Sequence, residues 1–218
     1  MQVLTLGPAR ARHVALFAAG GGGDPERHRP LLEHLAARDI HVIAPRFERL
    51  MAREANPAEL LARPAGLVEA LHRFAAPDAA VTAVGHSIGG WAALCLAGAR
   101  PWGRDGEPME VPREPRVGRL VLFAPAVGWF AAPGALDAVT APMLVFAGEL
   151  DAVTPAREIE GLSAAPSAVD LRVVPNAGHF AFMDTPPPNT LEDDAFDRER
   201  FLGELAAATA EFALESTL

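Results

Sequence analysis

The sequence contains no lysine, no tyrosine and only one cysteine, Cys95. A single cysteine cannot form a disulfide within the chain, and its place in an alanine-rich apolar segment is typical of a small buried side chain. With no lysine, all 19 basic residues are arginines, and the 28 acidic residues leave a net charge of −9. This acidic balance argues against nucleic acid or an anionic membrane surface as a partner.

The sequence also has no apolar run of membrane-spanning length, and its first residues lack the apolar core of a secretion signal. We therefore expect a cytoplasmic protein. At 218 residues, half of them hydrophobic, the chain has the length for one well-buried domain, residues 1–218, and is short for two. The sequence leaves the oligomeric state open.

Short apolar runs alternate with helical patterns along the chain. We expect strands at residues 3–6, 13–18, 40–44, 81–84, 119–124, 142–147 and 169–174. The last of these carries Asp170 and Arg172, which favours a position near the sheet edge. The alternation predicts an α/β fold, a doubly wound, mostly parallel sheet with helices on both faces.

Helix boundaries are marked by capping residues and prolines. Asn56 and Pro57 open a helical pattern that reaches Phe74, with a break expected at Pro64. Thr154 is expected to cap a short helix that begins beside Pro155.

One strand is followed by a turn with a recognisable chemical use. Residues 85–89 read Gly-His-Ser-Ile-Gly between a β-branched run and an apolar helix, which is the context of a nucleophile elbow. The tight turn strains the backbone of Ser87 and exposes its hydroxyl, while the flanking glycines avoid collisions between strand and helix. We predict that Ser87 is a nucleophile rather than a residue of a structural loop.

A serine nucleophile needs a base, and in a parallel sheet the site lies in loops after the strands. Of the seven histidines, only His179 lies in a loop directly after an expected strand. His86 lies on the elbow itself, where its ring should point away from the reactive side of Ser87. His179 is therefore the predicted general base.

The base in turn needs an acid to orient it. Asp151 follows the strand at residues 142–147, and the chain order Ser, Asp, His favours it as the acid over a role in a turn or helix cap. Glu149 is the competing carboxylate, so close to the strand end that it is expected to point along the sheet.

Backbone N–H groups must also bind the negative charge that develops on the substrate oxygen. The residue after the nucleophile, Ile88, is one expected donor. The other is expected in the glycine run at residues 20–23, where Gly21 is the first choice and Gly20 the alternative. The competing interpretation of this run is a flexible loop without a role in the site.

The remaining site predictions concern substrate contacts and metals. The aromatic residues expected on the catalytic side, either as substrate contacts or as core, are Phe47, Trp129, Phe130 and Phe182. No metal-binding motif is present, and the pair Asp24 and His28 is more typical of surface groups than of ligands. We expect neither a metal nor another cofactor.

Taken together, residues 85–90, 148–151 and 176–180 make the chain resemble the α/β-hydrolase superfamily. The resemblance covers the chain from about His13 to the last helix and implies an acyl-transfer enzyme such as an esterase or thioesterase. Its serine nucleophile argues against the dehalogenase and epoxide hydrolase branches, which use aspartate. Ala19 stands where many members carry histidine, which leaves the second oxyanion donor less defined.

Residues 125–141 are too few for a cap domain, so the chain resembles capless enzymes of the dienelactone hydrolase or carboxylesterase type. The expected function is cleavage of a small-molecule carboxylic ester or thioester through Ser87, His179 and Asp151. The alternatives are an acyltransferase or perhydrolase with the same triad, and a non-catalytic binding protein on the same fold.

Overall fold

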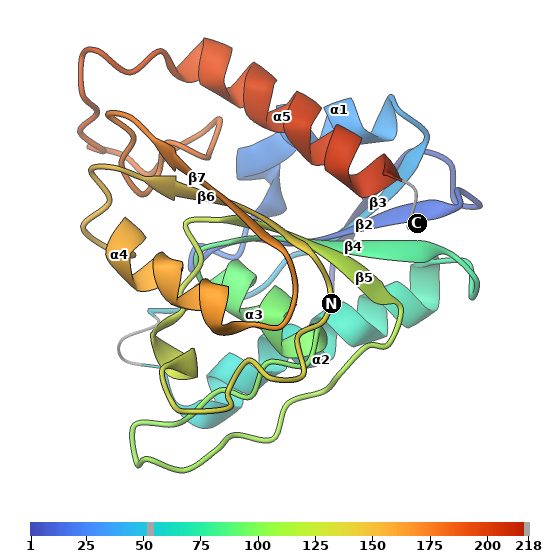
Figure 1. The fold of residues 1–218 in the computed structure, drawn as a ribbon. Helices are drawn as coiled ribbons and strands as arrows, with labels where there is room; N and C mark the ends of the chain where they lie inside the picture. The colour runs from blue at the N-terminus through green and yellow to red at the C-terminus, as the bar shows by residue number, and fades with distance from the viewer. Residues whose placement is uncertain (52–54, 216–218) are drawn as a thin grey trace.

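The computed structural model describes residues 1–51 and 55–215, which form a seven-stranded sheet with helices on both faces (Figure 1). The strand order is β1-β3-β2-β4-β5-β6-β7. The strands are β1 (Val3–Leu6), β2 (His13–Ala18), β3 (Ile40–Pro45), β4 (Ala80–His86), β5 (Val117–Phe123), β6 (Met143–Gly148) and β7 (Val169–Val174). Within this sheet β1 pairs antiparallel with β3, and the other neighbouring strands are parallel. The predicted doubly wound, mostly parallel sheet is confirmed.

Burial along the strands follows their place in the sheet. The central strand β2 is almost wholly buried, whereas β7 at the edge alternates between exposed and half-buried positions. The polar residues that predicted an edge, Asp170 and Arg172, form an ion pair on β7.

The sheet separates the core into two layers, each covered by helices. The α-helices are α1 (Arg29–Ala36), α2 (Pro57–Phe74), α3 (Ile88–Leu96), α4 (Ala156–Ile159) and α5 (Arg198–Leu214), with 3-10 turns η1 (Pro25–His28), η2 (Gly128–Phe130) and η3 (Glu160–Ala164). Helices α1 and α5 cover one face of the sheet, and α2, α3 and α4 cover the other (Figure 1). Leu16 and Phe17, adjacent on β2, belong to opposite layers because successive strand residues face opposite sides.

The break expected at Pro64 is wrong, because α2 continues through it. Because proline has no N–H, α2 lacks the hydrogen bond from residue 64 to the carbonyl of Leu60. A capping box between Asn56 and Glu59 fixes the start of the helix, and Leu67 and other side chains bury its inner face. Capping and packing together stabilise the helix enough to keep it continuous across the proline.

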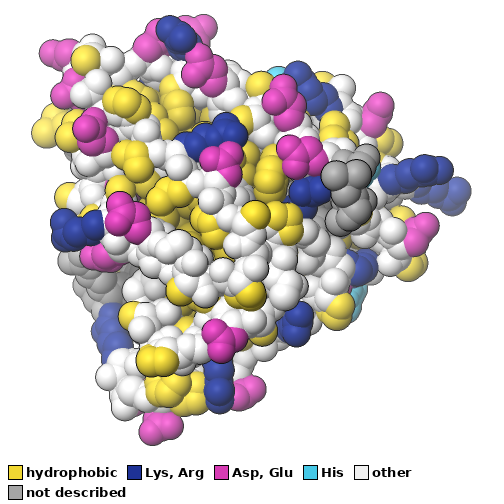
Figure 2. Space-filling view, in the orientation of Figure 1, with side chains coloured by type: hydrophobic (Ala, Val, Ile, Leu, Met, Phe, Trp, Pro, Cys, Tyr) yellow, Lys and Arg dark blue, Asp and Glu magenta, His cyan; other side chains and the backbone are white. Residues whose placement is uncertain are grey.

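The connection between β5 and β6 contains only the short turn η2 among its regular elements, which agrees with the expected absence of a cap domain. No described helix is both long enough and apolar enough to cross a membrane. On the face drawn in Figure 2, acidic and arginine side chains are interspersed rather than gathered by sign.

Candidate active site

The turn between β4 and α3 has the strained geometry expected from its sequence. Ser87 stands between them with φ of 55° and ψ of −120°, a conformation that L-residues rarely adopt. A Cβ on Gly85 would lie 2.5 Å from the backbone of Gly89, and one on Gly89 would lie 2.0 Å from the carbonyl oxygen of Ala18. Only glycine fits at these two positions, so the local sequence dictates the elbow.

Three residues that are distant in sequence meet at the carboxyl ends of β4, β6 and β7. His179 Nε2 lies 3.0 Å from Ser87 Oγ, and His179 Nδ1 lies 2.8 Å from Asp151 Oδ2. Because an ionised carboxylate only accepts hydrogen bonds, Nδ1 carries the imidazole proton and Nε2 faces the serine hydroxyl as acceptor. Asp151 and His179 are buried, whereas Ser87 is half-buried.

The carboxylate of Asp151 is held by a dense set of donors. Its Oδ1 accepts from the backbone N–H groups of Val153 at 2.7 Å and Thr154 at 2.9 Å. Burial alone would raise the pKa of Asp151, but hydrogen bonds from His179 and Thr154 outweigh it and hold that pKa below its usual range. Asp151 is therefore ionised at neutral pH, and it also makes the turn that was its alternative interpretation.

The sequence predicted that Thr154 caps the following helix, but it does not. Helix α4 begins after Pro155 without a side-chain cap, and the Thr154 hydroxyl instead lies in the site. Its Oγ1 lies 2.8 Å from Asp151 Oδ2, 3.2 Å from His179 Nδ1 and 3.0 Å from the carbonyl oxygen of Ala124. Its place three residues after the acid is the sequence signal that could have identified it.

The competing carboxylate, Glu149, lies outside this network. Its side chain is exposed, and its Oε2 accepts from the backbone N–H of Asn176 at 3.0 Å. The contact joins the loops after β6 and β7, which carry Asp151 and His179.

The glycine loop after β2 lies against the elbow. A Cβ added to Gly20 would be 3.5 Å from Ser87 Cβ and 3.1 Å from His86 Nδ1. Ile88 is the first residue of α3, so its N–H has no acceptor within the helix and is free for a ligand. The choice between Gly21 and Gly20 as the second oxyanion donor stays a prediction.

The rings of three histidines, His28, His86 and His179, lie in a row. The ring of His86 lies 5.1 Å from that of His179 and 5.3 Å from that of His28, measured between centroids. Burial, and then the neighbouring histidines, put the pKa of His86 well below its usual value. Burial likewise lowers the pKa of His28 to about 4. Both rings are neutral at neutral pH, so neither opposes a positive charge on His179.

Of the two roles left open for Phe182, the structure shows a core residue and not a substrate contact. Its ring is 1% exposed, stacks on Phe123 at 6.1 Å and meets Phe201 edge-on, so it belongs to the core layer under α5. Phe47 is half-buried and packs against Gly66 of α2, which commits its ring to the scaffold. Trp129 is half-buried, and the centroid of its ring lies 6.2 Å from that of Trp91. These three aromatic rings, which come from separate loops, pack inward because burying a large apolar surface is favourable.

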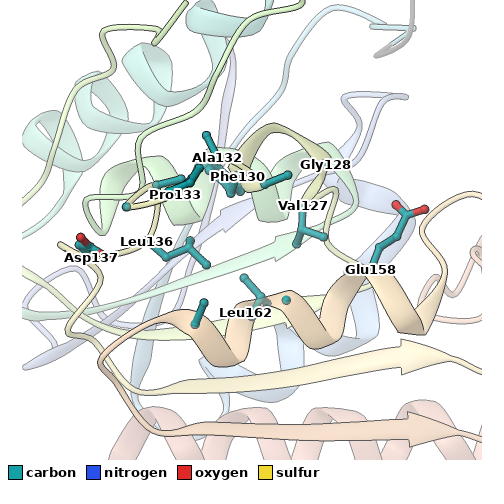
Figure 3. Close-up of a pocket in the computed structure, with 14 residues that line it drawn as sticks. Val127, Gly128, Phe130, Ala132, Pro133, Leu136, Asp137, Glu158 and Leu162 are labelled. Carbon is teal, nitrogen blue, oxygen red and sulfur yellow. The ribbon is translucent and has the colours of Figure 1, made fainter. Parts of the chain in front are cut away.

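Phe130 lines a cavity of about 480 Å³. The cavity lies between the segment after β5 and the α4–η3 region, with mainly apolar walls and two carboxylates, Asp137 and Glu158 (Figure 3). Val127, labelled in Figure 3, follows Ala126, whose N–H donates to the carbonyl oxygen of Ser87 at 3.0 Å. Val127 of the cavity wall is therefore adjacent in sequence to a backbone contact of Ser87, whereas the side chains of Ser87, Asp151 and His179 do not line the cavity.

The pair considered as metal ligands serves local structure. Asp24 caps η1 by accepting from the N–H of Glu26 and pairs with Arg46, while His28 is buried against Phe17. Within residues 1–51 and 55–215, no three histidines, cysteines or carboxylates are grouped as metal ligands.

No family model and no curated protein matches the sequence. Solved structures do match. Esterase 2 of Thermogutta terrifontis, phosphoramylated by tabun, is 20% identical with a TM-score of 0.66, over 99% of this chain and 91% of that one. The propionate-bound form of the esterase from this planctomycete is 19% identical with a TM-score of 0.66, over 96% and 87%. An alpha-beta serine hydrolase homologue from Coxiella burnetii is 16% identical with a TM-score of 0.62, over 96% and 89%. With this agreement over nearly its whole length, the chain has the α/β-hydrolase fold.

Proposed function

We propose that this protein is a serine hydrolase that cleaves carboxylic esters or thioesters without a cofactor. The observation that carries the proposal is the chain of contacts from Ser87 Oγ through the His179 imidazole to the Asp151 carboxylate, at 3.0 and 2.8 Å. These distances are those of hydrogen bonds, which a serine nucleophile needs with its base and a base needs with the acid that orients it.

The mechanism follows from the positions of these groups. Ser87 attacks the substrate carbonyl carbon while His179 Nε2 takes the hydroxyl proton. Ionised Asp151 holds the imidazole orientation and stabilises the imidazolium that forms. The proton then passes to the leaving group, and a water molecule activated by His179 releases the acyl group from Ser87.

The negative charge on the substrate oxygen needs donors on the other side of Ser87. The N–H of Ile88 fills one place, and the N–H of Gly21 in the loop beside the elbow fills the other. Preorganised donors of this kind are typically worth about a hundred- to a thousand-fold in rate each.

The cavity lined by Phe130 supports a substrate with an apolar acyl or alcohol group. Its about 480 Å³ is in the range of small-molecule sites, and Val127, Phe130 and Leu162 give it apolar walls. The carboxylates of Asp137 and Glu158 make it unfavourable for an anionic group. The similar esterase structures, one with propionate bound, agree with a small ester as substrate.

The test is a panel of p-nitrophenyl esters and acyl thioesters of graded length, together with labelling by a fluorophosphonate probe. Wild type should hydrolyse part of the panel and take the label, and Ser87→Ala should lose both. Ser163→Ala is the matched control, because Ser163 is an exposed serine on η3. Hydrolysis or labelling that survives in Ser87→Ala would overturn the proposal. So would a wild type that neither hydrolyses nor labels, which would favour a binding protein.

Added alcohols or peroxide as competing acceptors separate hydrolysis from acyl transfer.

A further inference from the structure

Arg63 interrupts the buried apolar face of α2. It lies three and four residues from Leu60 and Leu67, on the same side of the helix, and only 2% of its surface is exposed. Burying a guanidinium costs free energy unless its N–H groups find acceptors. A leucine at this position would avoid that cost, so we ask what the guanidinium of Arg63 does that an apolar side chain could not.

The acceptors of Arg63 are backbone carbonyls of the loops beside the elbow. Its Nη1 donates to the oxygens of Ala19 at 3.0 Å and Gly20 at 3.1 Å. Its Nη2 lies 3.4 Å from the oxygen of Gly21 and 3.3 Å from that of Glu48. In the part of the chain that the structure describes, no carboxylate forms an ion pair with this guanidinium.

These contacts set the direction of the peptide groups in the glycine loop. In a trans peptide, the carbonyl of one residue and the N–H of the next point in opposite directions. When the carbonyls of Ala19 and Gly20 face Arg63, the N–H groups of Gly20 and Gly21 face away from it. The Cα of Gly20 meanwhile lies against the elbow, where an added Cβ would be 3.5 Å from Ser87 Cβ.

The sequence of this loop does not itself favour one conformation. Residues 20–23 are all glycine, which has the largest conformational freedom of any residue. The other backbone contacts are a turn from Gly23 N–H to Gly20 oxygen and bonds from Leu50 and Phe47 N–H to Gly21 and Gly23 oxygens. Arg63 is the charged donor of this set, and it spans three consecutive carbonyls.

We propose that Arg63 is a positioning residue of the oxyanion hole, which fixes the glycine loop so that its N–H groups stay directed toward the substrate oxygen. The inference rests on the proposed serine hydrolase function. It makes oxyanion stabilisation depend on a side chain of α2 that does not itself touch the substrate. The forked guanidinium suits this work because it can reach several carbonyls at once, which a lysine ammonium cannot.

The test compares Arg63→Met and Arg63→Lys with wild type. We expect kcat for a reactive ester to fall about 10- to 100-fold in Arg63→Met, with KM changed less than about threefold, because the donors act in the transition state. The rate of fluorophosphonate labelling of Ser87 should fall by a similar factor, since the phosphonyl oxygen uses the same donors. Arg63→Lys should lose nearly as much.

Arg116→Met is the matched control. Arg116 is half-buried and also donates to a backbone carbonyl, that of Ala76, but it precedes β5 at the opposite end of the sheet. This variant should lose thermal stability and keep kcat.

An Arg63→Met protein that melts cooperatively and keeps wild-type kcat and labelling rate overturns the proposal, even if its Tm falls. If Arg63→Met does not fold, Arg63→Lys decides in the same way. A wild type without hydrolysis or labelling would instead remove the proposed function, and this inference with it.

Discussion

His86 Nε2 lies 3.0 Å from the backbone carbonyl oxygen of His179, and the two imidazole rings lie against each other. Because a carbonyl oxygen only accepts, His86 carries its proton on Nε2. His86, the residue before Ser87, thus holds the backbone of the proposed base, His179, across 93 positions of sequence. This hydrogen bond fixes the loop that carries His179 relative to the turn that carries Ser87.

We predict that His86→Phe lowers kcat about three- to tenfold. Phenylalanine keeps a ring against His28 and His179 but removes the hydrogen bond, whose net worth is about 0.5–1.5 kcal/mol. Ester hydrolysis at saturating substrate, with a thermal melt of each protein, measures the effect. Unchanged kcat and unchanged Tm together would show that the bond does not position His179.

The acid can be tested against its neighbour in sequence. In Asp151→Asn we expect kcat to fall on the order of 10³- to 10⁴-fold, because an amide no longer stabilises the imidazolium and favours the wrong tautomer. Glu149→Gln should stay within about twofold of wild type, since glutamine can still accept from Asn176 N–H and the side chain lies outside the triad network. Steady-state kinetics on one ester decides between the two carboxylates. A larger loss in Glu149→Gln than in Asp151→Asn would reverse the assignment.

The fold and the elbow could be predicted because local sequence dictates them. The alternation of strands and helices leaves few other topologies, and the glycines around Ser87 follow from sterics within one turn. The positions of Asp151 and His179 followed from the rule that ligand sites gather at the carboxyl ends of parallel strands. These inferences needed no knowledge of long-range side-chain contacts.

Apart from the break expected at Pro64, the errors and omissions concern side-chain partners that only the folded structure displays. Thr154 has the sequence context of a helix cap, but the nearby carboxylate and imidazole take its hydroxyl. Phe182 lies close to His179 in sequence, yet its ring turns inward because Phe123 and Phe201 offer a place in the core. Arg63 was missed because its acceptors are backbone carbonyls, which no sequence pattern displays.

The buried histidine His28 predicts a pH dependence of stability. Burial lowers its pKa from the ordinary value of 6.5 to about 4 in the folded protein. The unfolded chain therefore binds a proton at higher pH than the folded one. The stabilising effect of neutral His28 is complete above about pH 6.5 and is lost as the pH falls toward 4.

In His28→Phe, the loss of stability between pH 7 and 4 should be smaller than in wild type by about 3 kcal/mol, from the linkage of one shifted proton. Part of the loss should remain, because the pKa of His86 is lowered in the same direction. Urea unfolding at several pH values between 7 and 4 measures this. Parallel curves for the two proteins would show that His28 does not titrate as its burial implies.

If the cavity lined by Phe130 holds the acyl chain, it predicts how chain-length preference can be changed. Gly161 lines the cavity, and a Cβ added there meets no atom within 4 Å, so a larger side chain enters open space. In Gly161→Leu we expect kcat/KM for a hexanoate ester to fall at least about tenfold relative to the acetate ester, because each methylene excluded from an apolar pocket costs about 1–3 kcal/mol. Gly203→Leu is the matched control, since Gly203 has equally open surroundings on α5, across the sheet. If the hexanoate-to-acetate ratio is the same in both variants and in wild type, the acyl chain lies elsewhere. A ratio that falls in Gly161→Leu alone places the chain between the segment after β5 and η3.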